Sequence, residues 1–307
     1  MDAGRSLISV VIPCYNQARF LADAIGSARS DVFPVEVLVV DDGSTDGSAD
    51  VAGGFSSVTL IRQENRGLAA ARNRGLTAST GSFVIFLDAD DELLPGGIDT
   101  AARALSGHRD CAMAYGRCVM MGPDGEFWPT PAQAQVRAGH FAAFLRTNPI
   151  WMPAMAIFRR DVLQALGGFR EGFDAAADYD LYLRIAQERP IHDHGHRVAA
   201  YRRHPTALSG STLRMLRETL AVMQYHRDDA ERAGLLDTWR DGYAAWQDFY
   251  GTQLVEDIRT DVEAWQTRRA VGNGLELARL APKVFTRELR RAIRRRYAGR
   301  AIPAAEI

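Results

Sequence analysis

The 307-residue chain lacks the features that mark several special classes of protein. No apolar run approaches the roughly 20 residues that a membrane-spanning helix requires. There are three cysteines, without the spacing of metal ligands, so we expect reduced thiols and neither disulfides nor a zinc site. A strand-like segment begins already at Leu7, which leaves no room for a secretory signal. Repeats and low-complexity linkers are absent too, and we expect a cytoplasmic, globular protein.

The composition is that of an ordinary soluble protein, with 47% hydrophobic and 24% charged residues. The length suffices for one large domain, or for one domain with a smaller partner. The formal net charge of −1 hides an asymmetry. Residues 268–300 carry ten arginines and one lysine against two glutamates, a net charge of +9, and the residues before them carry −9. A basic tail on an acidic body is informative about partners.

The stretch from Phe83 to Asp91 joins five apolar residues to a cluster of carboxylates. The apolar run is typical of a strand buried on both faces. Asp88, Asp90 and Asp91 follow at once, and unpaired carboxylates so close together repel each other unless a cation lies among them. Such hard oxygen ligands suit magnesium or manganese. A solvated acidic turn that caps the next helix is the other interpretation.

Strand-like and helix-like segments alternate four times in the first hundred residues, with strands expected at 7–12, 35–40, 58–61 and 83–87. This alternation predicts an α/β fold with a mostly parallel central sheet and helices on both faces. Three of the strands end in polar residues, namely Tyr15–Asn16, Asp41–Asp42 and Asp88–Asp91. The carboxyl ends of parallel strands share one edge of the sheet, so we expect these side chains to converge on one crevice.

Four ordered segments carry a family resemblance. They are Pro13-x-Tyr15-Asn16, Asp41-Asp42-Gly43-Ser44-Thr45-Asp46, Asn65-Arg66-Gly67-x-x-x-Ala71-Arg72-Asn73-x-Gly75 and Phe86-Leu87-Asp88-Ala89-Asp90-Asp91. In this order and spacing the chain resembles a family 2 glycosyltransferase of GT-A fold, a nucleotide-diphospho-sugar transferase. The resemblance covers about residues 5 to 205. It implies an inverting, metal-dependent hexosyltransferase-type enzyme that moves a sugar from a nucleotide-diphosphate donor to a hydroxyl acceptor, in cell-surface polysaccharide or glycoconjugate synthesis.

The resemblance assigns a set of residues to the donor: Pro13, Tyr15, Asp42, Arg66, Arg72, Asp88, Ala89, Arg202 and His204. The ring of Tyr15 would stack on the nucleobase. The carboxylate of Asp42 would accept a hydrogen bond from a uracil-like base, which favours a UDP-sugar. For Arg66 and Arg72 a place near the diphosphate and a solvated surface both stay open.

The resemblance also assigns the metal ligands and the base. Asp90 would be the main ligand of Mg or Mn, with Asp88 and His204 beside it. Asp178 would be the catalytic base that removes the proton of the acceptor hydroxyl, although Ala177 stands where the family commonly has Glu. A carboxylate at a helix N-terminus is otherwise usually a cap.

Two other functions remain as alternatives. A nucleotidyltransferase also combines an α/β sheet with paired aspartates, but it would carry a Gly-rich phosphate loop where Pro13-Cys14-Tyr15-Asn16 stands. A non-catalytic sugar-nucleotide binding protein would have lost Asp90 or Asp178, and both are present.

The middle of the chain carries two tryptophans with two interpretations. Trp128 follows a strong turn at residues 122–125, and Trp151 lies in a Pro-flanked segment. Either could line an acceptor pocket, and either could be ordinary core. The histidines His192, His194 and His196 alternate as on a strand, without a second cluster to make a metal site, and we interpret them as surface residues.

The spacing of apolar residues becomes helical from Thr212 onward, so we expect a catalytic domain at 1–210 and a helical C-terminal region at 211–307. Phe285, Leu289, Ile293 and Tyr297 form one apolar stripe, flanked by arginines. Residues 284–297 could therefore bind an anionic membrane at its cytoplasmic face, where a glycan or lipid-linked acceptor would be met. Packing on the catalytic domain or on a second copy, in a homodimer, is the alternative. We expect no nucleic-acid partner.

Overall fold

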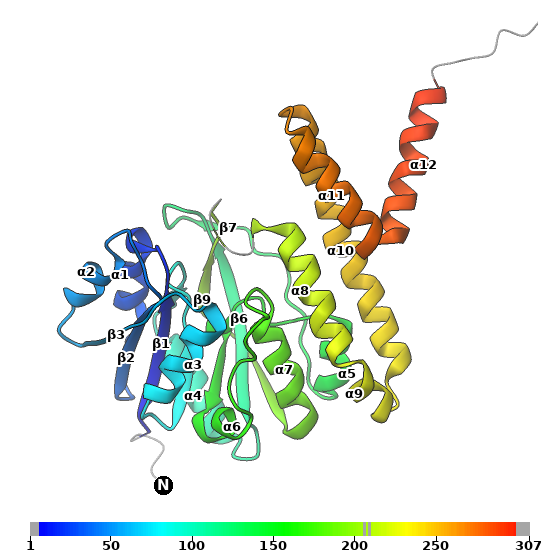
Figure 1. Ribbon diagram of the computed structural model, residues 1–307. Coiled ribbons are helices and arrows are strands. Elements are labelled where there is room, and N and C mark those ends of the chain that lie inside the picture. The colour runs from blue at the N-terminus through cyan, green and yellow to red at the C-terminus, as the bar shows by residue number, and fades with distance from the viewer. Residues whose placement is uncertain (1–5, 205–206, 208–209, 299–307) are drawn as a thin grey trace, which may run out of the picture. The chain divides into compact units, whose positions relative to one another are not determined.

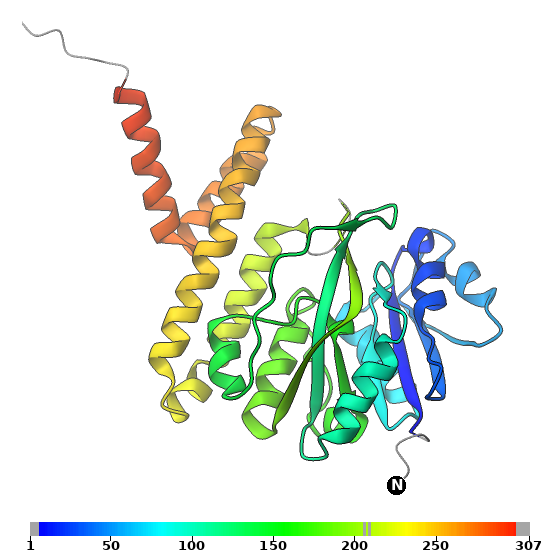
Figure 2. The ribbon, with the colours of Figure 1, turned by 180° about the vertical axis from the view of Figure 1, so that it is seen from behind.

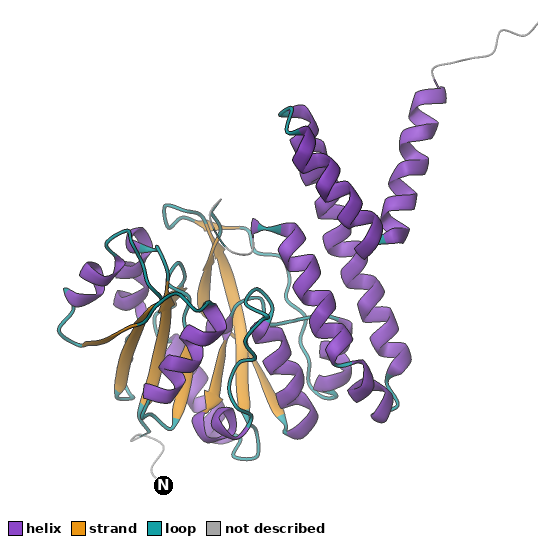
Figure 3. Ribbon diagram, viewed as in Figure 1, coloured by secondary structure: helices purple, strands orange, loops and turns teal. Residues whose placement is uncertain are grey.

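The computed structural model describes residues 6–204, 207 and 210–298. The chain divides into two compact units, Met1–Gly210 and Ser211–Ile307. The first contains both strands and helices, and the second contains helices within its described residues (Figures 1 and 3). The three cysteines, all in the first unit, are buried and unpaired with one another.

The elements of the first unit follow in chain order. The strands are β1 (Ile8–Cys14), β2 (Val35–Asp41), β3 (Val58–Arg62), β4 (Phe83–Phe86), β5 (Glu92–Leu93), β6 (Met113–Met121), β7 (Phe127–Trp128), β8 (Ala156–Arg159) and β9 (Ile191–Arg202). The helices are α1 (Ala18–Ser27), α2 (Ser48–Gly53), α3 (Leu68–Ala78), α4 (Gly97–Gly107), α5 (His140–Arg146), α6 (Arg160–Ala165) and α7 (Ala177–Glu188). A 3₁₀ turn, η2 (Pro153–Met155), precedes β8.

One sheet runs through the first unit in the order β3-β2-β1-β4-β8-β6-β9-β5, with β7 paired to β6. The first four strands are parallel, as their alternation with helices predicted. The other half is mixed, because β8 is antiparallel to both β4 and β6, whereas β6 and β9 are parallel. The strict strand-helix alternation ends after β4, so the parallel rule no longer applies there.

Helices cover both faces of this sheet, as predicted. Helices α3 and α7 lie on the face toward the viewer in Figure 1, and α4 lies on the opposite face, seen in Figure 2. Helix α1 belongs to the layer of α4, because the Ser30 hydroxyl just beyond α1 bonds the Asp99 carboxylate of α4. Helix α3 packs so closely that a Cβ at Gly75 would lie 2.2 Å from the Val11 side chain.

Strand β1 continues one residue past Pro13 and ends at Cys14, two residues beyond the predicted end. Val11 accepts a bond from Leu87 on the β4 side, and Cys14 accepts one from Asp42 on the β2 side. Backbone groups alternate sides along a strand, so Pro13 faces the β4 side, where β4 has already ended. A proline has no backbone N–H to donate. It is tolerated there because no carbonyl of β4 lies opposite it to accept a hydrogen bond.

The second unit consists of α8 (Thr212–Tyr225), α9 (Arg227–Arg232), α10 (Leu236–Glu263), α11 (Thr267–Leu280) and α12 (Pro282–Ala298). These helices have a core of their own, formed by Leu216, Leu220, Leu254, Val255, Leu277, Ala281 and Val284. None of the helices in the described residues is both long and apolar enough to cross a membrane.

The predicted apolar stripe of α12 does not stay on one exposed face. Val284 is buried and Phe285 packs against the core of the second unit, whereas Leu289 is exposed. The side chains of Ile293 and Tyr297 lie outside the described residues. Part of the stripe therefore packs within its own unit, which is a packing partner that the sequence did not predict.

Candidate active site

The carboxyl edge of the parallel strands carries the acidic residues, as predicted. Strand β4 ends at Phe86, and the chain then turns, with the Asp91 amide donating to the Asp88 carbonyl at 3.0 Å. Tyr15 follows β1 at the same edge and is 49% exposed. Its ring is therefore open to a ligand.

Asp90 and His204 come together at this edge although they are 114 residues apart in sequence. The His204 Nε2 lies 2.9 Å from the Asp90 Oδ2. The His204 ring also packs on Phe20 of α1, with 4.8 Å between ring centroids. The structure thus places two of the three predicted metal ligands within bonding distance of each other.

Arg202 is committed to protein partners. Its guanidinium donates to the Asp90 carbonyl at 2.8 Å and to the Pro123 carbonyl at 3.2 Å, and it pairs with Glu92. Its backbone amide donates to Asp91 at 2.8 Å, and its side chain is only 2% exposed. In this arrangement Arg202 holds the acidic turn, and it presents little surface to a ligand.

Arg72 is buried between two carboxylates. Its Nη2 lies 2.6 Å from the Asp88 Oδ1, and its positive charge also acts on Asp178. The guanidinium lies 5.2 Å from the centre of the Phe169 ring. Arg72 therefore belongs to the site, but as an inner residue that joins Asp88 to Asp178 and not as part of a solvated surface.

Asp178 lies in the first turn of α7, and its carboxylate accepts a hydrogen bond from the Tyr179 amide at 2.8 Å. Burial raises the pKa of Asp178 to about 6, against the opposing effect of the Arg72 charge. A carboxyl group with such a pKa can exchange a proton near neutral pH, which is a property of general bases.

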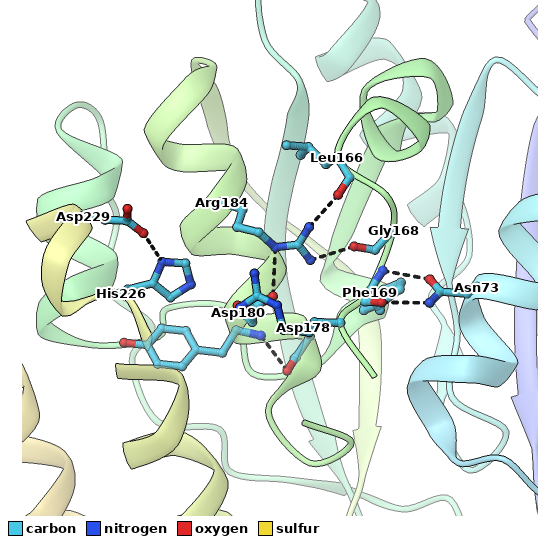
Figure 4. Close-up of polar contacts among 11 residues, drawn as sticks. Asn73, Leu166, Gly168, Phe169, Asp178, Asp180, Arg184, His226 and Asp229 are labelled. Atoms are coloured by element: carbon cyan, nitrogen blue, oxygen red, sulfur yellow. Dashed lines mark hydrogen bonds and ion pairs between the residues drawn. The ribbon is translucent and has the colours of Figure 1, made fainter. Parts of the chain in front are cut away.

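A structural network beside Asp178 was not predicted from the sequence. Asp180 is fully buried and pairs with Arg170 and with Arg184, both at 2.8 Å. Arg184 also donates to the carbonyls of Leu166 and Gly168 (Figure 4). The i,i+4 spacing of Asp180 and Arg184 was the signal that could have revealed this ion pair.

The same network positions Phe169. The Asn73 side chain makes two 2.8 Å hydrogen bonds with the Phe169 backbone, one to its carbonyl and one from its amide (Figure 4). The Phe169 ring then packs edge-on against Phe86, with 4.7 Å between centroids. Helix α3 and the turn after α6 are thereby locked around Arg72.

Asp42 holds the loop before α3. Its carboxylate accepts hydrogen bonds from the amides of Arg66 and Gly67, both at 2.9 Å, and from the Gln63 side chain at 2.7 Å. Asp42 is 3% exposed. The Arg66 guanidinium itself is largely exposed and lies 3.5 Å from Glu171. Asp42 and Arg66, both predicted to bind the nucleotide-sugar, are thus joined in one loop at the edge of the site.

The acidic turn concentrates negative charge. Burial together with the charges of Asp90 and Asp88 raises the pKa of Asp91 well above its usual value. Within the described residues, no group of three His, Cys, Asp or Glu side chains could hold a metal ion by itself. Asp90 and His204 could supply two ligands, and a cation there would take the rest from water and phosphate, as magnesium typically does.

The tryptophans and histidines of the middle region differ in how far their side chains are exposed. Trp128 is 39% exposed, so it is not a core residue, whereas Trp151 is partly buried. His192 stacks on His108, with 3.5 Å between centroids. His194 is more enclosed than predicted, and burial lowers its pKa to about 4.

Comparison with known proteins gives relatives that include glycosyltransferases and polysaccharide synthases. The chain is 26% identical over 192 residues to chondroitin synthase of Pasteurella multocida (strain Pm70), a match that covers 59% of the chain but only 19% of that enzyme. It is also 26% identical over 236 residues to the uncharacterized glycosyltransferase YibD of Escherichia coli (strain K12), covering 64% of the chain and 67% of YibD.

Solved structures share the fold. S. aureus TarS 1-349 in complex with UDP-GlcNAc superposes with a TM-score of 0.62 at 18% identity, covering 92% of this chain and 91% of that one. The mannosyltransferase PcManGT from Pyrobaculum calidifontis, in complex with GDP-Man and Mn2+, superposes with a TM-score of 0.58 at 20% identity. The match covers 89% of this chain and 87% of that one.

The family model for glycosyl transferase family 2 matches residues 9–167, a range that contains β1 except its first residue, β2 to β4, the acidic turn and Arg72. The likeness of fold agrees with that match. The chain belongs to glycosyltransferase family 2.

Proposed function

We propose that this chain is an inverting glycosyltransferase that moves a sugar from a UDP-sugar to a hydroxyl group of a glycan or lipid-linked acceptor. The observation that carries the proposal is the row of Asp88, Arg72 and Asp178, in which Arg72 is buried and the pKa of Asp178 is raised to about 6. A carboxylate with that pKa, set beside the turn that carries Asp90, can act as a general base.

The reaction that this arrangement supports is a single displacement. Asp178 takes the proton of the acceptor hydroxyl while the hydroxyl oxygen forms a bond to the anomeric carbon. The bond from that carbon to the diphosphate breaks, and its electron pair leaves with the diphosphate. One base suffices because no covalent intermediate with the enzyme forms. Asp88, held by Arg72, would bind the ribose or the sugar.

The nucleotide would bind at the ends of β1 and β2. Tyr15 is exposed and can stack on the base. Each carboxylate oxygen can accept two hydrogen bonds, and the Oδ2 of Asp42 accepts one, from the Gly67 amide. The remaining position can accept the N–H of uracil. That TarS 1-349 binds UDP-GlcNAc is consistent with a UDP-sugar for this chain.

Asp90 and His204 would hold Mg or Mn, with Asp88 nearby. When bound, the divalent cation would supply positive charge to the departing diphosphate. The observation behind this fit is the 2.9 Å distance between the His204 Nε2 and the Asp90 Oδ2, in a turn that also carries Asp88 and Asp91. The complex of PcManGT with Mn2+ is consistent with such an ion. In this proposal Arg202 keeps the turn in place instead of contacting the diphosphate.

The chondroitin synthase relative suggests an acceptor in polysaccharide synthesis. The exposed arginines of α12 suggest that the protein binds the cytoplasmic face of an anionic membrane. A nucleotidyltransferase is less well supported, because Pro13-Cys14-Tyr15 stands where its phosphate loop would be.

The test is a screen of UDP- and GDP-sugars for release of nucleoside diphosphate, with Mn2+ or Mg2+ and with excess chelator. We expect release from a UDP-sugar that needs the cation and that Asp90→Ala abolishes. The fold of that variant should survive, because removing one of three clustered carboxylates relieves repulsion. Full activity in chelator would contradict the metal, and release of a nucleoside monophosphate would favour nucleotidyl chemistry.

A further inference from the structure

A row of partly exposed apolar side chains crosses three strands beside the candidate active site. In the ladder of β6 and β7, Trp128 lies opposite Met120, and in the ladder of β6 and β9, Met120 lies beside Tyr201. Partners across a ladder have their side chains on the same face of the sheet. Tyr201, Met120 and Trp128 therefore form one row, which we call the ledge.

The ledge lies on the face of the sheet that α7 covers. Arg202 lies against α1, with its guanidinium 4.9 Å from the centre of the Phe20 ring. Successive side chains of a strand point to opposite faces, so Tyr201 faces away from α1. Helix α7, which carries Asp178, is in the layer opposite to α4 and α1 (Figures 1 and 2).

The ledge is also close along the chain to His204, one of the candidate metal ligands. Tyr201 is three residues from His204, and the amide of Arg203 donates to the Met121 carbonyl at 2.8 Å, which ties the hairpin to the end of β9. The hairpin is tied a second time, by Arg202 to Pro123. The ledge therefore has a fixed place at the edge of the site.

The aromatic rings of the ledge are oriented by polar partners. The indole Nε1 of Trp128 donates to Glu126 at 2.9 Å. The guanidinium of Arg203 lies 5.4 Å from the centre of the Tyr201 ring. Three neighbouring strands span about 10 Å, enough for a short run of linked sugar rings. Flat aromatic faces with charged hydrogen-bonding groups at either end suit a pyranose, which presents a C–H face and a rim of hydroxyls.

We infer that the ledge of Trp128, Met120 and Tyr201 binds the carbohydrate acceptor, as β-linked pyranoses whose C–H faces stack on the rings. The inference rests on the proposed function, because it assigns the acceptor side of that reaction. It places the acceptor on the Asp178 face of the sheet, whereas the nucleotide takes the ends of β1 and β2. Trp128 then acts as a specificity residue that contacts the acceptor away from the reacting atoms.

The hairpin supplies a matched control. Phe127 is 66% exposed, more than Trp128, but it pairs with Met121 and so points to the opposite face. The experiment measures saturation-transfer NMR of cellotetraose and of tetra-N-acetylchitotetraose with the full chain, in UDP and Mg2+. The proteins compared are the unchanged chain, Trp128→Ala, Trp128→Phe and Phe127→Ala. Calorimetric titration with UDP is run on each of them.

We expect at least one tetraose to bind the unchanged chain and Phe127→Ala equally. Trp128→Ala should bind it about tenfold more weakly, and Trp128→Phe should recover part of the loss, because a ring is restored. UDP affinity should be the same in all four. The inference is overturned if neither tetraose binds, if Trp128→Ala binds unchanged, or if Phe127→Ala loses as much. Tetraose binding without UDP binding would instead refute the proposed function and leave the ledge as a carbohydrate site.

Discussion

Two aspartates in the first turn of α7, two residues apart, differ completely in environment. Asp180 has no exposed surface and is neutralised by Arg170 and Arg184. Asp178 shares the charge of Arg72 with Asp88, and burial raises its pKa to about 6. A carboxylate paired with two arginines is suited to hold structure, whereas a carboxyl group with a raised pKa can exchange a proton. Asp180 therefore stabilises the fold, and Asp178 is the group suited to move a proton.

Replacing Asp178 by Asn removes the base and keeps the shape of the side chain. We expect kcat to fall roughly a hundredfold or more while donor affinity stays nearly unchanged, which is the usual size of a general-base contribution. Steady-state kinetics with the best donor and calorimetry with UDP measure the two quantities. Asp237→Asn is the control, since Asp237 also lies in the first turn of a helix. A variant that loses donor affinity but keeps its turnover would make Asp178 a binding residue.

The raised pKa of Asp178 predicts a pH dependence. The base acts only when ionised, so kcat/KM should fall as pH drops below about 6. For stability the sign is opposite: because the folded pKa is raised, the contribution of Asp178 is present at low pH and is lost as pH rises through that value. Arg72 lowers the pKa of Asp178, so Arg72→Met should move the acidic limb of kcat/KM to higher pH. A limb that stays in place in this variant would show that another group controls it.

At the scale of elements, α3, α7 and the turn after α6 form a support for the site. Gly167 and Gly168 both have φ near +70°, a conformation that glycine adopts without strain. Arg184 of α7 caps the carbonyls of this turn, and Asn73 of α3 holds the next residue, Phe169, by its backbone. Phe169 is thereby placed against Arg72, so an ion pair on α7 determines the position of a charge on α3.

Breaking that ion pair should cost stability. Arg184→Met leaves the buried carboxylate of Asp180 with Arg170 alone, and we expect a loss of roughly 3 kcal/mol in the free energy of unfolding. The matched control is Arg240→Met, which removes an exposed i,i+3 pair with Asp237 and should cost about 0–1 kcal/mol. Urea unfolding of both variants measures the difference. Equal losses would mean that the Arg184 pair contributes no more than a surface pair.

At the scale of the whole molecule, each unit has its own core. In the second unit, Val284 and Phe285 of α12 pack with residues of α8, α10 and α11. Beyond them Arg287, Arg290, Arg291 and Arg294 lie along one open hollow, with Lys283 at its start. Arg287 pairs with Asp248, and Arg291 pairs with Glu288. The basic surface of α12 is thus carried by a helix that its own unit anchors.

This anchoring decides how a membrane role should be tested. Deleting α12 would remove core residues, so charge reversal is the better change. If α12 binds anionic membranes, Arg290→Glu combined with Arg294→Glu should strongly reduce co-sedimentation with phosphatidylserine vesicles at low salt, since each basic residue contributes about 1 kcal/mol near the surface. Asp237→Asn, which adds no negative charge, serves as the control. If the unchanged chain stays in the supernatant, α12 is a packing element only.

The sequence by itself determined the first half of the sheet and the acidic edge. Strands β1 to β4 were predicted within two residues of their bounds, because burial on both faces leaves a local pattern in the sequence. The convergence of Tyr15, Asp42 and Asp88 also followed, since parallel strands must share an edge. The family was evident for the same reason: its motifs are short, and they lie where strands end.

Only the tertiary structure decided what depends on distant neighbours. The mixed order of β8, β6 and β9 depends on pairings between segments far apart in sequence, which no local pattern encodes. Arg72, Arg202 and Arg66 are the same residue type, yet the first two are buried against carboxylates or carbonyls and the third is exposed. The stripe of α12 and the ring of Trp128 were visible as apolar residues, but their exposure depends on which surfaces cover them. Burial is a property of the packed chain, and the pKa of Asp178 depends on that burial.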